Sequence, residues 1–194
     1  MIILKKEARM KNLHDKCKQN CCTFGAQHHR LLFGYGNNID PKIVFIGESP
    51  SIKGEKEENV CPFDLKSKPV FDEILKLFNT TREQSYTTNL VKCSIPYQRI
   101  GDIDKCLPVL LEELDIINAQ LNIVLSKKIS QVLFPNARFP THLYFQNRAF
   151  ILYYHPMYVI YGKISVDEYI NNLKNLYSEV KLLAQRNLYD YNII

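Results

Sequence analysis

Cysteine is the residue type whose spacing in this chain most clearly indicates chemistry. Cys17, Cys21 and Cys22 stand together near the N-terminus, and Cys93 and Cys106 follow much later in the sequence. Groups so far apart are expected to close a long loop around a metal site rather than to form a ladder of disulfides. Four thiolates suit an iron–sulfur cluster or a zinc ion, and the residues alone do not separate the two.

Three polar residues add a second set of candidate functional groups. Glu48, Asn89 and His155 each stand at or just past the end of an apolar run that indicates a buried strand. In parallel α/β sheets, ligands bind where the carboxyl ends of the strands meet. A carboxylate, an amide and an imidazole at one edge could orient water, recognise a base and donate a hydrogen bond. Together with the cysteines, they favour an enzyme that acts on nucleic acid.

The elements that must position these side chains alternate between strands and helices. We predict strands over residues 42–46, 86–91, 122–125 and 150–154, and helices over residues 4–15, 70–78, 107–114, 129–133 and 164–183. Pro108 would then lie in the first turn of its helix, where a missing N–H costs nothing. The alternation predicts a three-layer α/β/α sandwich with a central, mainly parallel four-stranded sheet.

The bulk properties limit the classes of protein to consider. The 194 residues contain no internal repeat or linker, so we expect a single domain over residues 1–194, acting as a monomer. A net charge of +5 is compatible with a polyanionic partner. We find neither a signal peptide nor an apolar run long enough for a membrane span. We therefore expect a cytoplasmic, reducing location without membrane contact, where cysteines are metal ligands or core residues.

Four short motifs stand in a recognisable order. They are KIVFIGESP over residues 42–50, Pro62-Phe63, TNLVKC over residues 88–93, and His155-Pro156. With the cysteines in the intervals between them, these motifs resemble the uracil-DNA glycosylase superfamily, and most closely its iron–sulfur branch, family 4. The resemblance covers roughly residues 17–175. It implies a single uracil-DNA-glycosylase-like domain, a [4Fe–4S] cluster held by four cysteines, and removal of uracil from DNA without a catalytic metal.

The resemblance also implies which cysteines hold the cluster. The ligands would be Cys17, Cys22, Cys93 and Cys106, with Cys21 as the alternate to Cys22. The family usually has Cys-x2-Cys at the first pair, which this chain departs from. Zinc remains the alternative metal, because it too accepts four thiolates. Either metal would be structural.

The resemblance also implies which residues recognise the base. A glycosylase extrudes its target base and recognises the Watson–Crick edge. The Asn89 amide can accept from uracil N3–H and donate to O4, or it could simply cap a turn. Phe63 would stack on the base, unless it is an ordinary core residue. Ser49 and Pro50 would shape the turn that binds the base.

Two residues are implied to carry the catalytic step. Cleavage of the N-glycosidic bond leaves negative charge on the pyrimidine O2, and a neutral His155 could donate a hydrogen bond to it. Glu48 would face the sugar, stabilise the oxocarbenium-like transition state and orient the attacking water. The alternatives are a structural histidine and a solvent-exposed glutamate.

Basic residues complete the expected DNA-binding surface. Lys53 and Arg99 are the candidates for phosphate contacts, and Lys92, Lys105 and Lys56 could contribute. Such contacts make binding sensitive to salt. The acidic pair usual in the family's following loop is out of register here. Glu55, Glu57 and Glu58 lie nearby, and the sequence does not show which of them, if any, assists Glu48.

We therefore predict a monofunctional DNA glycosylase that flips uracil, or a related damaged base, and hydrolyses its N-glycosidic bond in base-excision repair. One alternative keeps the fold and changes the base to hypoxanthine or a modified phage pyrimidine, because the loop after Pro50 and Cys61 depart from the family pattern. A second alternative is a catalytically silent DNA-binding iron–sulfur protein. A third is a small zinc-stabilised structural domain.

Overall fold

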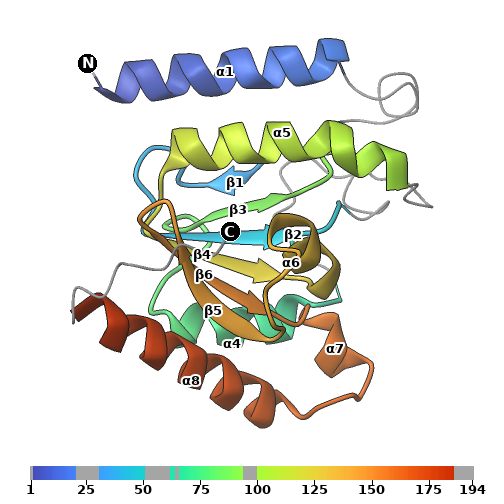
Figure 1. Ribbon diagram of the computed structural model, residues 1–194, viewed down its shortest axis with the longest axis vertical. Coiled ribbons are helices and arrows are strands. Elements are labelled where there is room, and N and C mark those ends of the chain that lie inside the picture. The colour runs from blue at the N-terminus through green and yellow to red at the C-terminus, as the bar shows by residue number, and fades with distance from the viewer. Residues whose placement is uncertain (1, 21–30, 51–61, 64–65, 94–99, 186–194) are drawn as a thin grey trace.

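A sheet of six strands lies at the centre of the described part of the chain (Figure 1). The computed structural model describes residues 2–20, 31–50, 62–63, 66–93 and 100–185. The strands pair in the order β1-β3-β2-β4-β6-β5. Their bounds are β1 (Tyr35–Gly36), β2 (Ile43–Gly47), β3 (Tyr86–Asn89), β4 (Leu121–Leu125), β5 (Thr141–Phe145) and β6 (Arg148–Tyr153).

The four inner strands are parallel, as the sequence predicts. β3, β2, β4 and β6 pair in parallel, whereas β1 and β5 add antiparallel edges. The parallel register places Gly47 opposite Asn89 at the carboxyl ends of β2 and β3. The predicted α/β sandwich is therefore confirmed, with two edge strands more than expected.

The unpredicted strand β5 owes its place to a tight turn. β5 and β6 form an antiparallel hairpin in which Phe145 pairs with Arg148. The two residues between them, Gln146 and Asn147, have φ of 50° and 61°. Positive φ at both positions is the geometry of hairpin turns that match strand twist. Gln-Asn is a weaker turn signal than Asn-Gly, and for this reason the sequence pattern did not reveal the hairpin.

Helices cover both faces of the sheet (Figure 1). One face carries α5, with α1 lying along its outer side, and the other carries α4 and α8. Alternation in β2 feeds both cores, since Val44 and Ile46 pack with α5 while Phe45 packs with α4. The helices are α1 (Ile2–Asn20), α4 (Lys68–Leu77), α5 (Ile100–Ile117), α6 (Lys127–Leu133), α7 (Met157–Ile160) and α8 (Val166–Gln185).

Helix α5 differs from its predicted start. It begins at Ile100, so that Pro108 lies inside the helix and not in its first turn. A proline there removes one helical hydrogen bond. Burial of Ile103, Leu110 and Leu114 in the core offsets that loss, because tertiary packing supplies most of a helix's stability.

Helix α1 is longer than predicted and is tied to the rest of the fold. It extends to Asn20 and so includes Cys17. The Lys6 ammonium donates to the carbonyl oxygens of Ile39 at 2.8 Å and Ile117 at 3.1 Å. Among the described residues, no helix has the length and apolar character needed to cross a membrane.

Candidate active site

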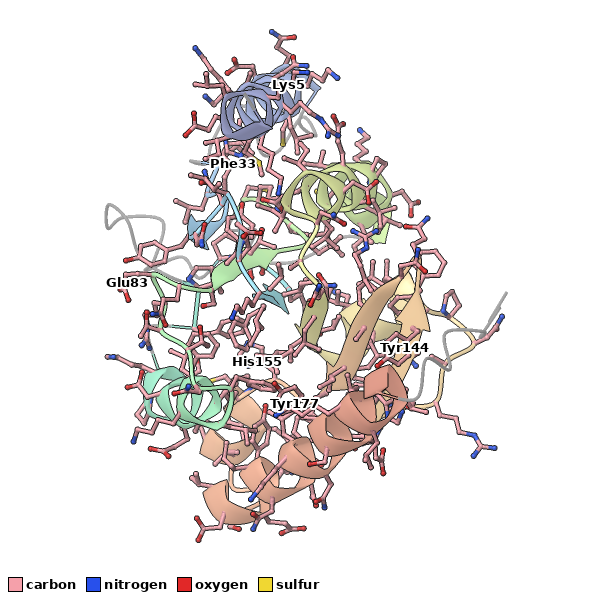
Figure 2. The ribbon with its side chains drawn as sticks, turned by 90° about the vertical axis from the view of Figure 1, so that its left-hand side faces the viewer. Lys5, Phe33, Glu83, Tyr144, His155 and Tyr177 are labelled. Atoms are coloured by element: carbon pink, nitrogen blue, oxygen red, sulfur yellow. The ribbon has the colours of Figure 1, made fainter. Side chains whose placement is uncertain are left out.

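The predicted functional residues meet at the carboxyl edge of the sheet. Glu48 directly follows β2, Asn89 ends β3, and His155 lies two residues beyond β6. Figure 2 shows His155 inside the molecule, between the strands and the layer formed by α4 and α8. These three strands are parallel, so their ends bring the three side chains to one edge.

Gly47 lets the Asn89 amide and the Phe63 ring approach each other. A Cβ at this position would lie 2.9 Å from Phe63 Cζ and would overlap Asn89 Oδ1. Neither distance leaves room for a methyl group, and β2 and β3 are fixed by their pairing. A methyl group here would force both side chains to shift, so glycine allows the Asn89 amide and the Phe63 ring to pack close to the same backbone atom.

Phe63 adopts an unusual backbone conformation to reach this place. Its φ is +72°, a region that a bulky residue rarely enters and that often accompanies functional sites. The Ser67 hydroxyl donates to the Phe63 carbonyl at 3.0 Å. The ring lies 4.8 Å from Phe71 and 5.3 Å from His155, measured between centroids. These contacts hold the ring beside the imidazole.

The hydrogen bonding of His155 defines its neutral form. The Met157 backbone N–H donates to His155 Nδ1 at 3.0 Å. In the neutral ring an accepting Nδ1 leaves the proton on Nε2. Burial lowers the pKa of His155 from 6.5 to about 4, although the nearby Glu48 carboxylate raises it. At neutral pH the ring is therefore uncharged and carries a donor on Nε2.

Glu48 has a partner that sequence reasoning missed. Lys128 Nζ donates to Glu48 Oε1 at 2.8 Å, and both side chains are partly exposed. The backbone of Glu48 is held as well, since its carbonyl accepts from the Val91 N–H at 2.9 Å. Lys128 follows the carboxyl end of β4, so the rule that found Glu48 could have found it too.

One predicted DNA contact is wrong. Lys92 is only 2% exposed and forms an ion pair with Glu113 of α5. A lysine buried and paired in this way cannot meet a phosphate. Lys105, by contrast, is exposed on α5.

Several predicted residues lie outside the described ones. Ser49 and Pro50 are described and half-buried, directly after Glu48. The others belong to three stretches, at residues 21–30, 51–61 and 94–99: they are Cys21, Cys22, Lys53, Glu55, Lys56, Glu57, Glu58, Cys61 and Arg99.

Three of the predicted cluster ligands lie on or beside packed elements. Cys17 is buried on α1, Cys93 is buried just after β3, and Cys106 is half-buried on α5. Helix α1 packs on α5, and Cys93 and Cys106 border the same hydrophobic core. The three cysteines therefore lie on or beside elements on the α5 side of the sheet. The described residues taken alone contain no group of three potential metal ligands.

Comparison with known proteins agrees with the resemblance inferred from the motifs. The family model for the uracil DNA glycosylase superfamily matches residues 33–179. A protein of Thermotoga maritima named type-4 uracil-DNA glycosylase is 30% identical over 62% of this chain and 63% of its own length. The Archaeoglobus fulgidus protein of the same name is 28% identical over 81% of this chain and 85% of its own length.

A third relative, from Saccharolobus solfataricus and also named type-4 uracil-DNA glycosylase, is 33% identical over 61% of this chain and 55% of its own length. The chain thus spans less than two thirds of two of these three relatives. The family model, however, covers the sheet and the whole candidate site from Gly47 to His155. The chain therefore belongs to the uracil DNA glycosylase superfamily.

Proposed function

We propose that this protein is a monofunctional uracil-DNA glycosylase of the iron–sulfur type. It flips uracil out of DNA and hydrolyses the N-glycosidic bond, leaving an abasic site for base-excision repair. Membership of the superfamily supports this activity, as do three relatives named type-4 uracil-DNA glycosylase. The observation that carries the proposal is the neutral His155, with its donor on Nε2, at the same sheet edge as Glu48 and Asn89.

Asn89 and Phe63 recognise the base in this proposal. Asn89 is 5% exposed and lies beside the Phe63 ring over Gly47. An amide held in one orientation accepts from uracil N3–H and donates to O4, whereas cytosine presents the opposite pattern at these positions. Ser49 and Pro50 complete the base-binding turn. Stacking on an aromatic ring adds about 1–3 kcal/mol per base.

His155 stabilises the leaving group. As the glycosidic bond breaks, negative charge develops on the uracil ring, including its O2 atom. A hydrogen-bond donor at O2 stabilises that charge. The Nε2–H donates to that oxygen without giving up its proton, because Met157 fixes the tautomer by bonding to Nδ1. A preorganised donor of this kind contributes about 2.7–4 kcal/mol to transition-state stabilisation.

Glu48 acts on the other half of the substrate. Its carboxylate faces the positive charge that develops on the sugar, and it orients the water that attacks the anomeric carbon. Lys128 holds this carboxylate from the side of α6. The proposal thus separates two charges, with the cation of the sugar near Glu48 and the anion of the base near His155.

We further propose that Cys17, Cys22, Cys93 and Cys106 hold a [4Fe–4S] cluster, with Cys21 as the alternate to Cys22. When bound, the cluster would link α1, α5 and the segment after Asn89 and take no part in the chemistry. Anaerobic purification should give about four irons per chain with a broad visible absorption. Zinc in place of iron, or full iron loading of Cys93→Ser, would contradict this assignment.

The activity is tested by base release from matched single- and double-stranded oligonucleotides. We expect the protein to act as a single-domain monomer that contacts DNA through Lys53 and Arg99. It should release uracil, and alkali should then cleave the DNA at the abasic sites. Cytosine and thymine in the same sequence should remain intact. Release of only hypoxanthine or a modified pyrimidine would change the substrate, and tight binding without release would indicate a silent DNA-binding protein.

A further inference from the structure

A buried ion pair lies directly behind Asn89. Glu113 of α5 is 0% exposed and Lys92, three residues after Asn89, is 2% exposed. Their charged groups are in contact inside the core. Neither group takes part in the proposed chemistry, although both lie next to the residue proposed to recognise the base.

Every polar atom of the pair is used. The Lys92 ammonium donates to Glu113 Oε2, to Thr88 Oγ1 at 2.7 Å and to the Asn89 carbonyl oxygen at 2.7 Å. Glu113 also accepts from the Tyr86 hydroxyl at 2.7 Å and from the Thr88 hydroxyl at 2.9 Å. Three donors on the ammonium meet three acceptors, as the chemistry of lysine allows.

The network and the Asn89 amide lie on opposite faces of the sheet. Tyr86 packs in the core beneath α5, whereas the Asn89 side chain lies beside Phe63, which belongs to the core beneath α4. Successive strand residues point to opposite faces. Lys92 therefore donates to the Asn89 backbone carbonyl on the α5 side of the sheet, while the Asn89 amide faces the base on the other side.

Stability alone does not explain such a pair. Replacing a buried ion pair with apolar residues is often neutral or stabilising, because desolvation offsets the Coulomb attraction. Charge-assisted hydrogen bonds are short and directional, however, and in a low dielectric they hold their acceptors firmly. The acceptor here is the carbonyl of the residue that recognises uracil.

We propose that Lys92, oriented by Glu113, is a positioning residue that fixes the Asn89 backbone and with it the direction of the base-recognising amide. This inference rests on the proposed function. It assigns to the pair a part in base recognition, exerted wholly through Asn89 and not through contact with DNA.

The test is a double-mutant cycle measured under single-turnover conditions. Lys92→Met alone would leave Glu113 charged and unpaired, so the working variant is Lys92→Met/Glu113→Gln, which removes both charges and keeps partners for Tyr86 and Thr88. It is made with Asn89 and with Asn89→Ala. Arg148→Met is the matched control, because Arg148 is also buried and bonds to α5, at the Leu114 carbonyl 3.0 Å away.

With Asn89 present, the working variant should lose about 100-fold in the rate of uracil release, the cost of a misplaced group. With Asn89→Ala it should lose no more than about twofold further. Inhibition by free uracil should weaken in parallel, while affinity for abasic DNA stays unchanged. Arg148→Met should alter none of these three quantities in folded protein.

Equal losses in both backgrounds would overturn the inference, because the pair would then act through general stability. An unchanged rate in the working variant would overturn it as well. If the wild-type chain releases no uracil, the proposed function fails and the inference falls with it. Activity in the wild type with an additive cycle overturns the positioning role alone.

Discussion

The two faces of the sheet bury ionisable groups in opposite ways. Beneath α5, Lys92 and Glu113 form a buried ion pair through direct contact. On the side of α4, His155 lies beside the Phe63 ring as a neutral group, and burial lowers its pKa to about 4. Pairing and neutralisation are the two physical answers to the cost of burying charge. The first keeps strong donors for positioning, and the second keeps an uncharged donor for the substrate.

The largest effect should come from breaking the pair on one side only. Lys92→Met leaves Glu113 as an uncompensated buried charge, which should lower the free energy of unfolding by about 3–5 kcal/mol. Lys92→Met/Glu113→Gln should recover most of that loss. Urea unfolding of both variants measures the difference, and equal destabilisation would show that the charges do not depend on each other.

Removing the neutral donor should mainly affect catalysis. His155→Ala should lower the rate of uracil release by about 10²–10³-fold, the usual cost of one oxyanion donor. His155→Gln is the matched control, since its amide can still donate. A wild-type rate in His155→Ala would remove the imidazole from the mechanism.

The neutral state of His155 should also appear in the pH dependence of stability. Its folded pKa of about 4 lies below the ordinary 6.5, so the unfolded chain binds a proton first as the pH falls. The contribution of the neutral His155 to the free energy of unfolding is therefore fully present above about pH 6.5. It decreases toward pH 4, by up to about 3 kcal/mol. Between pH 7.5 and pH 5 the urea midpoint should therefore fall further in the wild type than in His155→Gln, which has no titrating imidazole. A constant difference would contradict the buried neutral ring.

Gly47 lies next to both Asn89 and Phe63, and its substitution tests how tightly these two side chains are packed. Gly47→Ala should cost about 1–3 kcal/mol in stability through overpacking, because its Cβ would meet both Asn89 and Phe63. Uracil release should fall more steeply than stability predicts. Gly162→Ala is the control, since a Cβ there meets nothing within 4 Å although its φ of +67° adds local strain.

The smallest effect on stability should come from the exposed ion pair. Lys128→Ala removes a partner from Glu48, yet pairs of this exposure contribute about 0–1 kcal/mol. The expected change is a lower rate of uracil release with an almost unchanged urea midpoint. Lys127→Ala, one residue away on α6, serves as the control. Equal rates in the two variants would remove Lys128 from the site.

The contacts of this site differ in how far the sequence predicts them. Apolar runs in the sequence predict the parallel strands. Because functional side chains gather at the carboxyl ends of such strands, the same runs also predict the positions of Glu48, Asn89 and His155. Local pattern predicts Lys92 at the surface, and its burial depends on Glu113, which lies 21 residues away on a helix. The tautomer of His155 depends on one backbone N–H from Met157. Such contacts exist only once the chain has folded.

The proposed site is best tested by measuring uracil release by wild type, Asn89→Ala, Glu48→Gln and His155→Ala on one oligonucleotide, with cytosine at the same position as the reference. We predict rapid release of uracil by the wild type, no release of cytosine, and a large loss in each variant of the three strand-end residues. Wild-type rates in all three variants, or equal release of uracil and cytosine, would contradict the proposed site.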